Sequence, residues 1–167
     1  LGLLKHCLFL ANTDTRLHAY TSLIRATLEY ASVTWHPHNA NLTCLESVQN
    51  KAARFISRSY SPSQSVSELK ISLNLSCLST RQKLARLSFF HSLYHSDSSF
   101  ATSHLYPAHH ISNHVDHALK VLPVFAHTKK YQNSPLVLSI EEWNSLPDNL
   151  VSIIDSNSFR TALTSFL

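Results

Sequence analysis

The scarcity of glycine is the feature that most limits what this chain can fold into. Its 167 residues contain a single glycine, Gly2. Glycine adopts positive φ without strain and lets the backbone approach a bound phosphate closely. The sequence therefore excludes a glycine-rich nucleotide-binding loop and the G-x-S-x-G nucleophile turn of α/β-hydrolases. Turns must be formed by Ser, Asn, Asp and Pro instead.

The composition is that of a folded globular protein. Hydrophobic residues make up 44% of the chain and charged residues 14%, which differs from the charge-rich composition of disordered proteins. No segment approaches the roughly 18 consecutive apolar residues of a membrane span, and the apolar start lacks a signal-peptide cleavage site. Because the chain has no methionine and begins within a helical pattern, we expect a fragment or a processed product. Three cysteines without a C-x-x-C motif predict packed, reduced thiols in an intracellular protein, nuclear or cytoplasmic.

Apolar residues at helical spacing predict a mainly α fold, an irregular bundle of about five to six helices. The run Asn12-Thr13-Asp14 is expected to cap a helix that continues to about residue 33. Tyr30 and Trp35 are expected in the core or at a corner at its end, and Pro37 stops it. A last helix is expected to start near Asp155 or Ser156. Four S/T-x-x-E/Q capping boxes predict the starts of the others: Thr43 with Glu46, Ser65 with Glu68, Ser79 with Gln82, and Ser139 with Glu142.

The chain is expected to have three segments. Residues 1–95 form a basic helical region, 96–138 a Ser/His-rich linker or loop, and 139–167 a C-terminal helical segment. A short strand or strand pair is predicted at 121–125 or 136–140, and in the last helix Phe159, Leu163 and Phe166 are expected to face inward.

The twelve histidines suggest a metal site that other features disfavour. His91 and His95 have the i, i+4 spacing of a helical metal pair, but the glutamate of an H-E-x-x-H motif is missing. A loose group, His104, His109, His110, His114 and His117, has no cysteine nearby, so solvated loop histidines are the simpler interpretation. We therefore expect no metal and no cofactor. No adjacent aspartates could hold two catalytic metal ions.

Basic residues are concentrated in the first hundred positions. Residues 1–100 hold ten Lys/Arg against five Asp/Glu, whereas 101–167 hold four against five. Lys51, Arg54 and Arg58, at steps of three and four, form one stripe of a helix beside the apolar stripe. Such a stripe could bind phosphates, or it could be a solvated face.

A second basic group, Arg81, Lys83 and Arg86, lies at the start of the 79–95 helix. Cations near a helix N-terminus oppose the helix dipole, so helix stability does not explain them. Phosphate binding would explain them, and so would a salt-bridged face.

Two blocks of sequence resemble the region that follows the polymerase core in non-LTR (LINE-type, jockey-like) retrotransposon reverse transcriptases. The second block is Trp143-Asn144-Ser145-Leu146-Pro147. The first consists of Tyr20-x-x-Leu23-Ile24-Arg25-x-x-Leu28-Glu29-Tyr30-Ala31, then Trp35-x-Pro37, then Leu45-Glu46-x-Val48-Gln49-x-x-Ala52-Ala53-Arg54-Phe55.

The resemblance implies a thumb-like, C-terminal helical region without catalytic residues, because the family's Asp-Asp motif is absent from this sequence. The implied partners are the RNA/DNA template–primer duplex and the upstream polymerase core, with no membrane. The implied phosphate-binding residues are Arg25, Lys51, Arg54, Arg58, Arg81, Lys83 and Arg86. The alternative is a helical protein-interaction module that does not bind nucleic acid.

Overall fold

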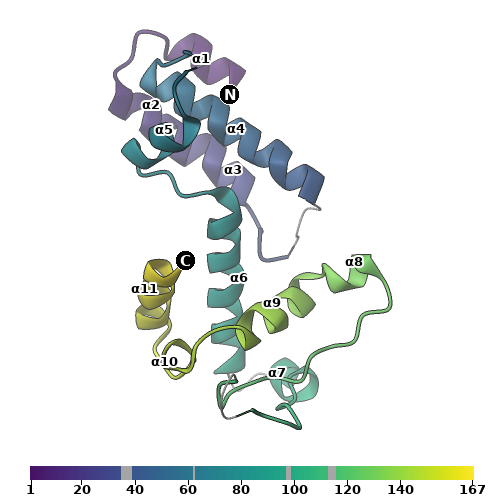
Figure 1. Cartoon of the computed structure of the whole chain (residues 1–167). Coiled ribbons are helices and arrows are strands. Elements are labelled where there is room, and N and C mark those ends of the chain that lie inside the picture. The colour runs from purple at the N-terminus through teal and green to yellow at the C-terminus, as the bar shows by residue number, and fades with distance from the viewer. Residues whose placement is uncertain (35–38, 62, 97–98, 113–115) are drawn as a thin grey trace. The chain divides into compact units, whose positions relative to one another are not determined.

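The computed structural model describes residues 1–34, 39–61, 63–96, 99–112 and 116–167, without the side chains of 39–41. The chain forms two compact units (Figure 1). Unit 1 comprises Leu1–Ser32 and Pro37–Arg81, and unit 2 comprises Val33–His36 and Gln82–Leu167. The prediction of a mainly α fold is confirmed, but the predicted number of helices is too low. Several extra helices are single turns of four residues, too short to show a periodic apolar pattern.

Unit 1 is built around the long helix α4. Its elements are α1 (Gly2–Cys7), α2 (Thr13–Ala19), the π-helical segment η1 (Tyr20–Arg25), α3 (Ala26–Glu29), α4 (Asn39–Ser57) and α5 (Val66–Ser72). Helix α2, η1 and α3 follow one another without a break, and the Asn12 side chain caps α2 as predicted, accepting from Thr15 N at 2.8 Å. Tyr30 is the C-cap residue of α3 and is 79% exposed, so of the two predicted positions it takes the corner at the helix end and not the core. Trp35 and Pro37 lie outside the described residues.

The core of unit 1 forms where α2 and η1 pack against α4. Tyr20, Ala52 and Ile56 are fully buried there, with Phe55 and Leu75 almost so. These residues come from the apolar stripes that the sequence pattern predicts, together with the segment after α5. The packing holds the two basic residues of α4, Lys51 and Arg54, on the side away from this core.

Unit 2 is built around α6 and a buried tryptophan. Trp143 is fully buried, with its ring centroid 5.3 Å from that of Phe90, and its Nε1 donates to Leu119 O at 3.0 Å. Phe159 and Leu163 are buried as predicted, whereas Phe166 is 54% exposed, contrary to prediction. The elements are α6 (Leu78–Tyr94), which begins in unit 1, α7 (Ser99–His104), α8 (Lys129–Gln132), α9 (Pro135–Asn144), α10 (Asp148–Val151) and α11 (Ser156–Phe166).

The segment from 96 to 138 contains more helix than a loop would. Besides α7 and α8, it contributes an isolated antiparallel bridge between Pro107 and Val121. The strand predicted at 136–140 is wrong, because those residues belong to α9. Pro135 is prearranged for the first turn of that helix. The three predicted segments were defined by composition, whereas the two units are defined by how the chain packs. The units therefore do not test the segments, which stay a prediction.

Three of the four predicted capping boxes are wrong. Thr43, Ser79 and Ser139 lie inside α4, α6 and α9, because each helix starts before its predicted cap. Ser65 does precede α5, but its side chain makes no capping hydrogen bond. The last helix starts as predicted, with Asp155 accepting from Ser158 N at 2.8 Å.

Candidate nucleic-acid interface

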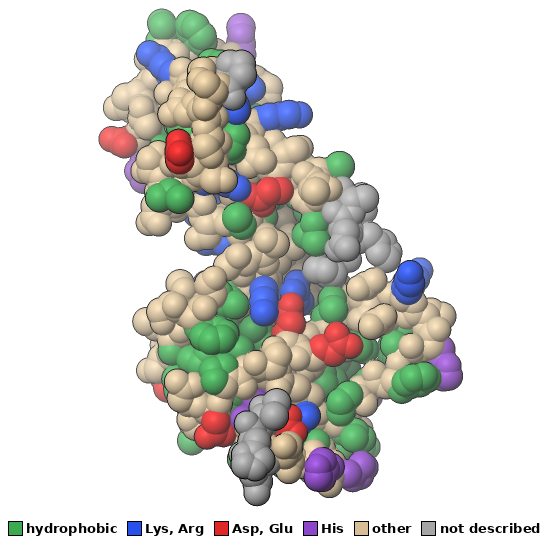
Figure 2. Space-filling model, viewed as in Figure 1, with side chains coloured by type: hydrophobic (Ala, Val, Ile, Leu, Met, Phe, Trp, Pro, Cys, Tyr) green, Lys and Arg blue, Asp and Glu red, His purple; other side chains and the backbone are tan. Residues whose placement is uncertain are grey.

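The net positive charge of the chain lies wholly in unit 1. Unit 1 contains eight Lys/Arg and four Asp/Glu, whereas unit 2 contains six of each. The formal charge of +4 for the whole chain is therefore the charge of unit 1. Figure 2 shows Lys and Arg side chains protruding at several places on the drawn face of this unit. An excess of one sign on a surface attracts partners of the opposite sign.

Two of the four acids of unit 1 are engaged in ion pairs. Arg81 donates from Nε and Nη2 to the two carboxylate oxygens of Glu29, and this hydrogen bonding raises the pKa of Arg81. Glu46 accepts from Lys70 Nζ at 2.8 Å and from Leu78 N at 3.0 Å. Burial alone would lower the pKa of Lys70, but the bond to Glu46 raises it overall. The remaining acids, Asp14 and Glu68, are exposed.

Glu46 belongs to a polar cluster that fixes the start of α6 against α4. Gln49 donates to Ser76 O at 2.8 Å and accepts from the Tyr20 hydroxyl at 3.0 Å. Burial raises the pKa of Tyr20 to about 12, so this hydroxyl remains a donor at neutral pH. Since Leu78 N is the first amide of α6 and Glu46 binds it, Glu46 caps α6 from another helix. The sequence motif around Glu46 thus has a structural role that its spacing did not reveal.

The seven residues predicted to bind phosphate are divided between the units. Arg25, Lys51, Arg54, Arg58 and Arg81 belong to unit 1, and Lys83 and Arg86 belong to unit 2.

Their environments also differ. Arg86 is buried and donates to both oxygens of Glu142, at 2.5 and 3.2 Å. For Arg81 and Arg86 the structure thus provides the ion-pair role that we set against phosphate binding. Lys51 is exposed on α4, whereas Arg25 and Lys83 are half-buried.

The C-terminal end of α4 is held by arginine side chains. Arg54 donates to Ser61 O at 2.9 Å. The chain leaves the helix through a left-handed residue, Arg58, with φ of 53°. Arg58 N bonds to Phe55 O and Ser59 N bonds to Arg54 O, at 3.4 and 3.1 Å. This is a Schellman motif, in which glycine is usual at the left-handed position.

A buried guanidinium that the sequence analysis missed also binds this end of α4. Arg16 is 1% exposed and donates to Phe55 O and Ile56 O, at 3.1 and 3.3 Å. It also donates to three carbonyls of the segment between α1 and α2, and its guanidinium carbon lies 5.1 Å from the Phe55 ring centroid. The signal was a charged residue four positions before Tyr20, on the apolar face of its helix.

Arg16 and Arg58 share acceptors. The Nη2 atom of Arg16 donates to Phe9 O and Ala11 O at 3.0 and 2.7 Å, and Nη2 of Arg58 donates to the same oxygens at 2.8 and 3.4 Å. Burial and the nearby charge of Arg58 lower the pKa of Arg16. In the part of the chain that the structure describes, neither guanidinium forms an ion pair with a carboxylate.

A cavity of about 260 Å³ opens beside these two guanidiniums. We call it the arginine pocket. Two of its aromatic walls, Phe9 and Tyr60, are 70% and 61% exposed. The residues that line it are Phe9, Leu10, Arg16, Phe55, Arg58 and Tyr60. No carboxylate is among them, so the pocket combines positive charge with aromatic surface.

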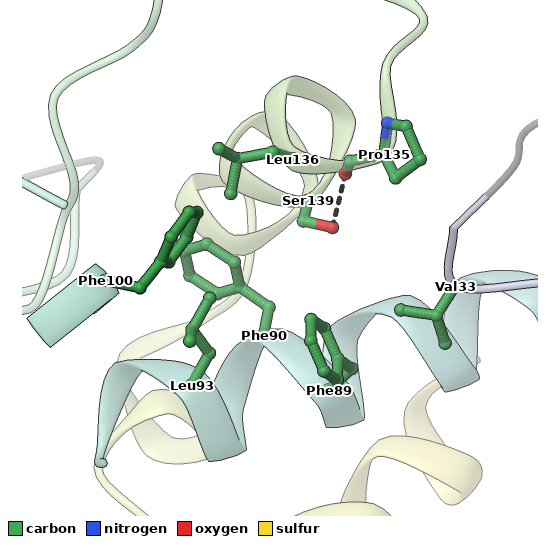
Figure 3. Close-up of a pocket in the computed structure, with 8 residues that line it drawn as sticks. All are labelled: Val33, Phe89, Phe90, Leu93, Phe100, Pro135, Leu136 and Ser139. Carbon is green, nitrogen blue, oxygen red and sulfur yellow. Dashed lines mark hydrogen bonds between the residues drawn. The ribbon is translucent and has the colours of Figure 1, made fainter. Parts of the chain in front are cut away.

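Unit 2 has an apolar pocket that is larger than the arginine pocket (Figure 3). Its volume is about 310 Å³. Figure 3 shows Phe89, Phe90 and Leu93 of α6 on one side. The Ser139 hydroxyl bonds to Pro135 O of its own helix at 2.6 Å and is not free to bind a ligand. The described residues lining this pocket include no titratable side chain, which makes it a poor catalytic site.

Several histidines of unit 2 are structural. His91 is fully buried, donates from Nε2 to Ile153 O at 2.6 Å and stacks on Phe159 at 4.1 Å between ring centroids. His117, expected to be a solvated loop residue, is buried and bonds to Trp143 O at 3.0 Å. That expectation is wrong because the segment folds back onto the core. Of the other predicted loop histidines, His104, His109 and His110 are exposed, and His114 lies outside the described residues.

The described residues contain neither a group of side chains that could bind a metal ion nor packed thiols. No group of three His, Cys, Asp or Glu side chains converges there to hold a metal ion. Cys7, Cys44 and Cys77 are free thiols and exposed, so the prediction of packed thiols is wrong. The period of the apolar pattern did not show that these three cysteines face the surface.

The comparisons with known proteins add no assignment. Models of protein families, curated proteins and solved structures return no match to this chain. Within the described residues, every helix is too short or too polar to cross a membrane. The resemblance to reverse transcriptases stays a prediction.

Proposed function

We propose that this chain is the non-catalytic C-terminal region of a retrotransposon reverse transcriptase and helps to hold the template–primer duplex. The observation that carries the proposal is the confinement of the net charge to unit 1, where Arg16, Arg54 and Arg58 bind carbonyl groups instead of carboxylates. Such cations keep their charge available to an external anion. The resemblance of the two sequence blocks supplies the class of enzyme.

The interface we propose lies along the second half of α4. Lys51, Arg54 and Arg58 follow one another at steps of three and four residues on this helix and its end, a spacing suited to the phosphates of one backbone. Contacts of this kind are independent of base sequence and weaken as salt rises. The half-buried Arg25 and Lys83 and the ion-paired Arg81 and Arg86 would contribute mainly to the surrounding potential.

The acidic residues are the reason for proposing that this chain is non-catalytic. Polymerase chemistry needs carboxylates that share two metal ions. In the described residues, Glu29, Glu46, Glu142 and Asp116 are each bound to a basic side chain. Because the family's Asp-Asp motif is also absent from this sequence, we assign the catalytic step to the polymerase core implied by the resemblance.

The test is duplex binding as a function of salt. Anisotropy of a labelled RNA/DNA duplex is measured with the full chain and with Lys51→Gln/Arg54→Gln/Arg58→Gln. Since each lost phosphate contact removes about 0.9 from the slope of log K against log salt, the slope should fall by up to about 3. Lys129→Gln/Lys130→Gln on exposed α8, in the neutral unit, is the matched control and should leave the slope unchanged.

The alternative is a helical module that binds protein only. It is favoured by exposed apolar side chains on unit 1, namely Leu3, Phe9, Leu10, Leu23 and Ile71. Self-association in analytical ultracentrifugation, without any affinity of the unaltered chain for the duplex, would establish this alternative and refute the first proposal.

A further inference from the structure

The arginine pocket holds two positive charges that the protein only partly neutralises. Arg16 and Arg58 bind five carbonyl groups near the end of α4 and before α2, two of them in common. The C-terminal end of a helix offsets about half an elementary charge. Against two guanidinium charges this leaves an excess, and the described residues supply no carboxylate to balance it. An external anion would complete the site.

The backbone at Arg58 fixes where this side chain leaves the end of α4. A residue with a Cβ is strained at its φ of 53°, where glycine is preferred. The Schellman motif that ends α4 holds the residue in this conformation. The arginine side chain at this position lies on the pocket wall, so the strained residue is also one that a ligand would meet.

The exposed aromatic walls indicate what else the ligand carries. Phe9 and Tyr60 leave most of their surface to solvent at the mouth of the cavity. Aromatic rings beside a cation form the stacking surfaces on which single-stranded nucleic acids bind. The cavity of about 260 Å³ lies below the roughly 300–1,000 Å³ of pockets for drug-sized ligands. It therefore fits one small planar group.

We propose that the arginine pocket binds one unpaired nucleotide of a single-stranded nucleic acid, with its phosphate at Arg58 and its base against Phe9 and Tyr60. This inference rests on the proposed function, because it assumes that unit 1 faces nucleic acid. It deepens that function by assigning the pocket to the unpaired part of the substrate. Bases inside a duplex are already stacked on each other and cannot enter. A carboxylate of an acidic protein would use the guanidinium but leave the aromatic walls without a partner.

The experiment compares three labelled oligonucleotides on the full chain: a blunt duplex, the same duplex with a single-stranded overhang, and a single strand. Phe9→Ala and Tyr60→Ala should each weaken binding of the single strand and the overhang duplex about tenfold, the middle of the range for base–aromatic stacking. Binding of the blunt duplex should not change. Tyr131→Ala, a half-exposed tyrosine of unit 2, is the matched control and should alter none of the three.

Arg58→Gly tests the cation separately. Glycine suits the left-handed backbone at this position, so the variant should keep the end of α4, which far-UV circular dichroism and thermal melting would verify. It should lower the salt slope for the single strand by about 0.7, the value for one contact in single strands.

The outcomes separate the two proposals. If the blunt duplex binds but the Phe9 and Tyr60 variants leave single-strand binding unchanged, the pocket proposal is overturned and the proposed function stands. If no oligonucleotide binds the unaltered chain, both are overturned. If polyglutamate displaces the single strand at equal charge concentration and the aromatic variants have no effect on either, the pocket is an acidic-peptide site and the inference is refuted.

Discussion

The two units treat their charged side chains in opposite ways. Unit 2 pairs cations with carboxylates, as in Arg86–Glu142 and Lys120–Asp116, and its formal charge is zero. Unit 1 also forms two such pairs, but it binds Arg16 and Arg58 to neutral carbonyls. An ion pair removes charge from the surface, whereas a carbonyl partner fixes the guanidinium and leaves its charge in place. The choice of partner, more than the number of basic residues, decides which unit can attract an anion.

The interiors differ as well. Unit 2 buries a tryptophan, several aromatic rings and two histidines, His91 and His117. Unit 1 has a smaller apolar core and stabilises one end of its main helix with a buried arginine. Variants that remove one of these features from one unit show whether the two units unfold independently.

The largest effect is expected for Trp143→Ala. Removing a fully buried tryptophan leaves a cavity and should cost unit 2 about 3–5 kcal/mol in the free energy of unfolding. Urea unfolding and amide hydrogen exchange measure it, and exposed Phe166→Ala should change stability by less than about 0.5 kcal/mol. Equal loss of protection in unit 1 would show that the units unfold as one.

The next effect is expected for Arg16→Met in unit 1. The substitution keeps the apolar stem but removes the guanidinium donor from the carbonyls of Phe55 and Ile56, so that Phe55 O keeps only the 3.4 Å bond from Arg58 N. An unsatisfied buried acceptor costs about 1–3 kcal/mol. We expect a loss of about 3 kcal/mol in the free energy of unfolding, concentrated in the exchange of α4 amides. Arg16→Lys keeps the positive charge but has fewer hydrogen-bond donors, so it should recover part of the lost free energy of unfolding. A loss of less than about 1 kcal/mol would mean that water replaces the guanidinium.

The smallest expected effect is a dependence on pH confined to unit 2. Burial, and then the charge of His91, lower the pKa of His95 from its ordinary value of 6.5. The unfolded chain therefore binds a proton more readily than the folded one. The contribution of neutral His95 to stability is complete above about pH 6.5 and is lost as the pH falls through the lowered pKa.

Thermal melts from pH 7.5 to 5 should show this destabilisation, and His95→Gln should reduce it. The control is His104→Gln, on an exposed histidine of the same unit. An unchanged pH profile for His95→Gln would assign the effect to other histidines.

Local pattern was enough to predict several of the longer helices, but not the single-turn helices or the contacts between helices. The apolar spacing of 79–95 predicted α6, and the predicted cap at Asn12 is confirmed. The last helix starts at Ser156, where a start near Asp155 or Ser156 was predicted. Glu46 and Glu142 had the spacing of capping boxes, yet they bind Lys70 and Arg86 from other helices. A carboxylate three residues after a Ser or Thr satisfies the motif wherever it lies, so only the three-dimensional partner decides its role. The arginine pocket was missed for the same reason, since its residues come from three separate segments.

The sequence by itself determined the class of fold and the excess of positive charge in the first half of the chain. One glycine and apolar residues at steps of three and four leave little besides helices. The tertiary structure decided which cations remain available, because that depends on the partner each one meets. It placed Arg81 and Arg86 against carboxylates and Arg16 and Arg58 against carbonyls. Arg16, Arg81 and Arg86 lie between 39 and 56 residues along the chain from the partners in these helix-end contacts and ion pairs. A local sequence motif cannot reveal partners at such separations.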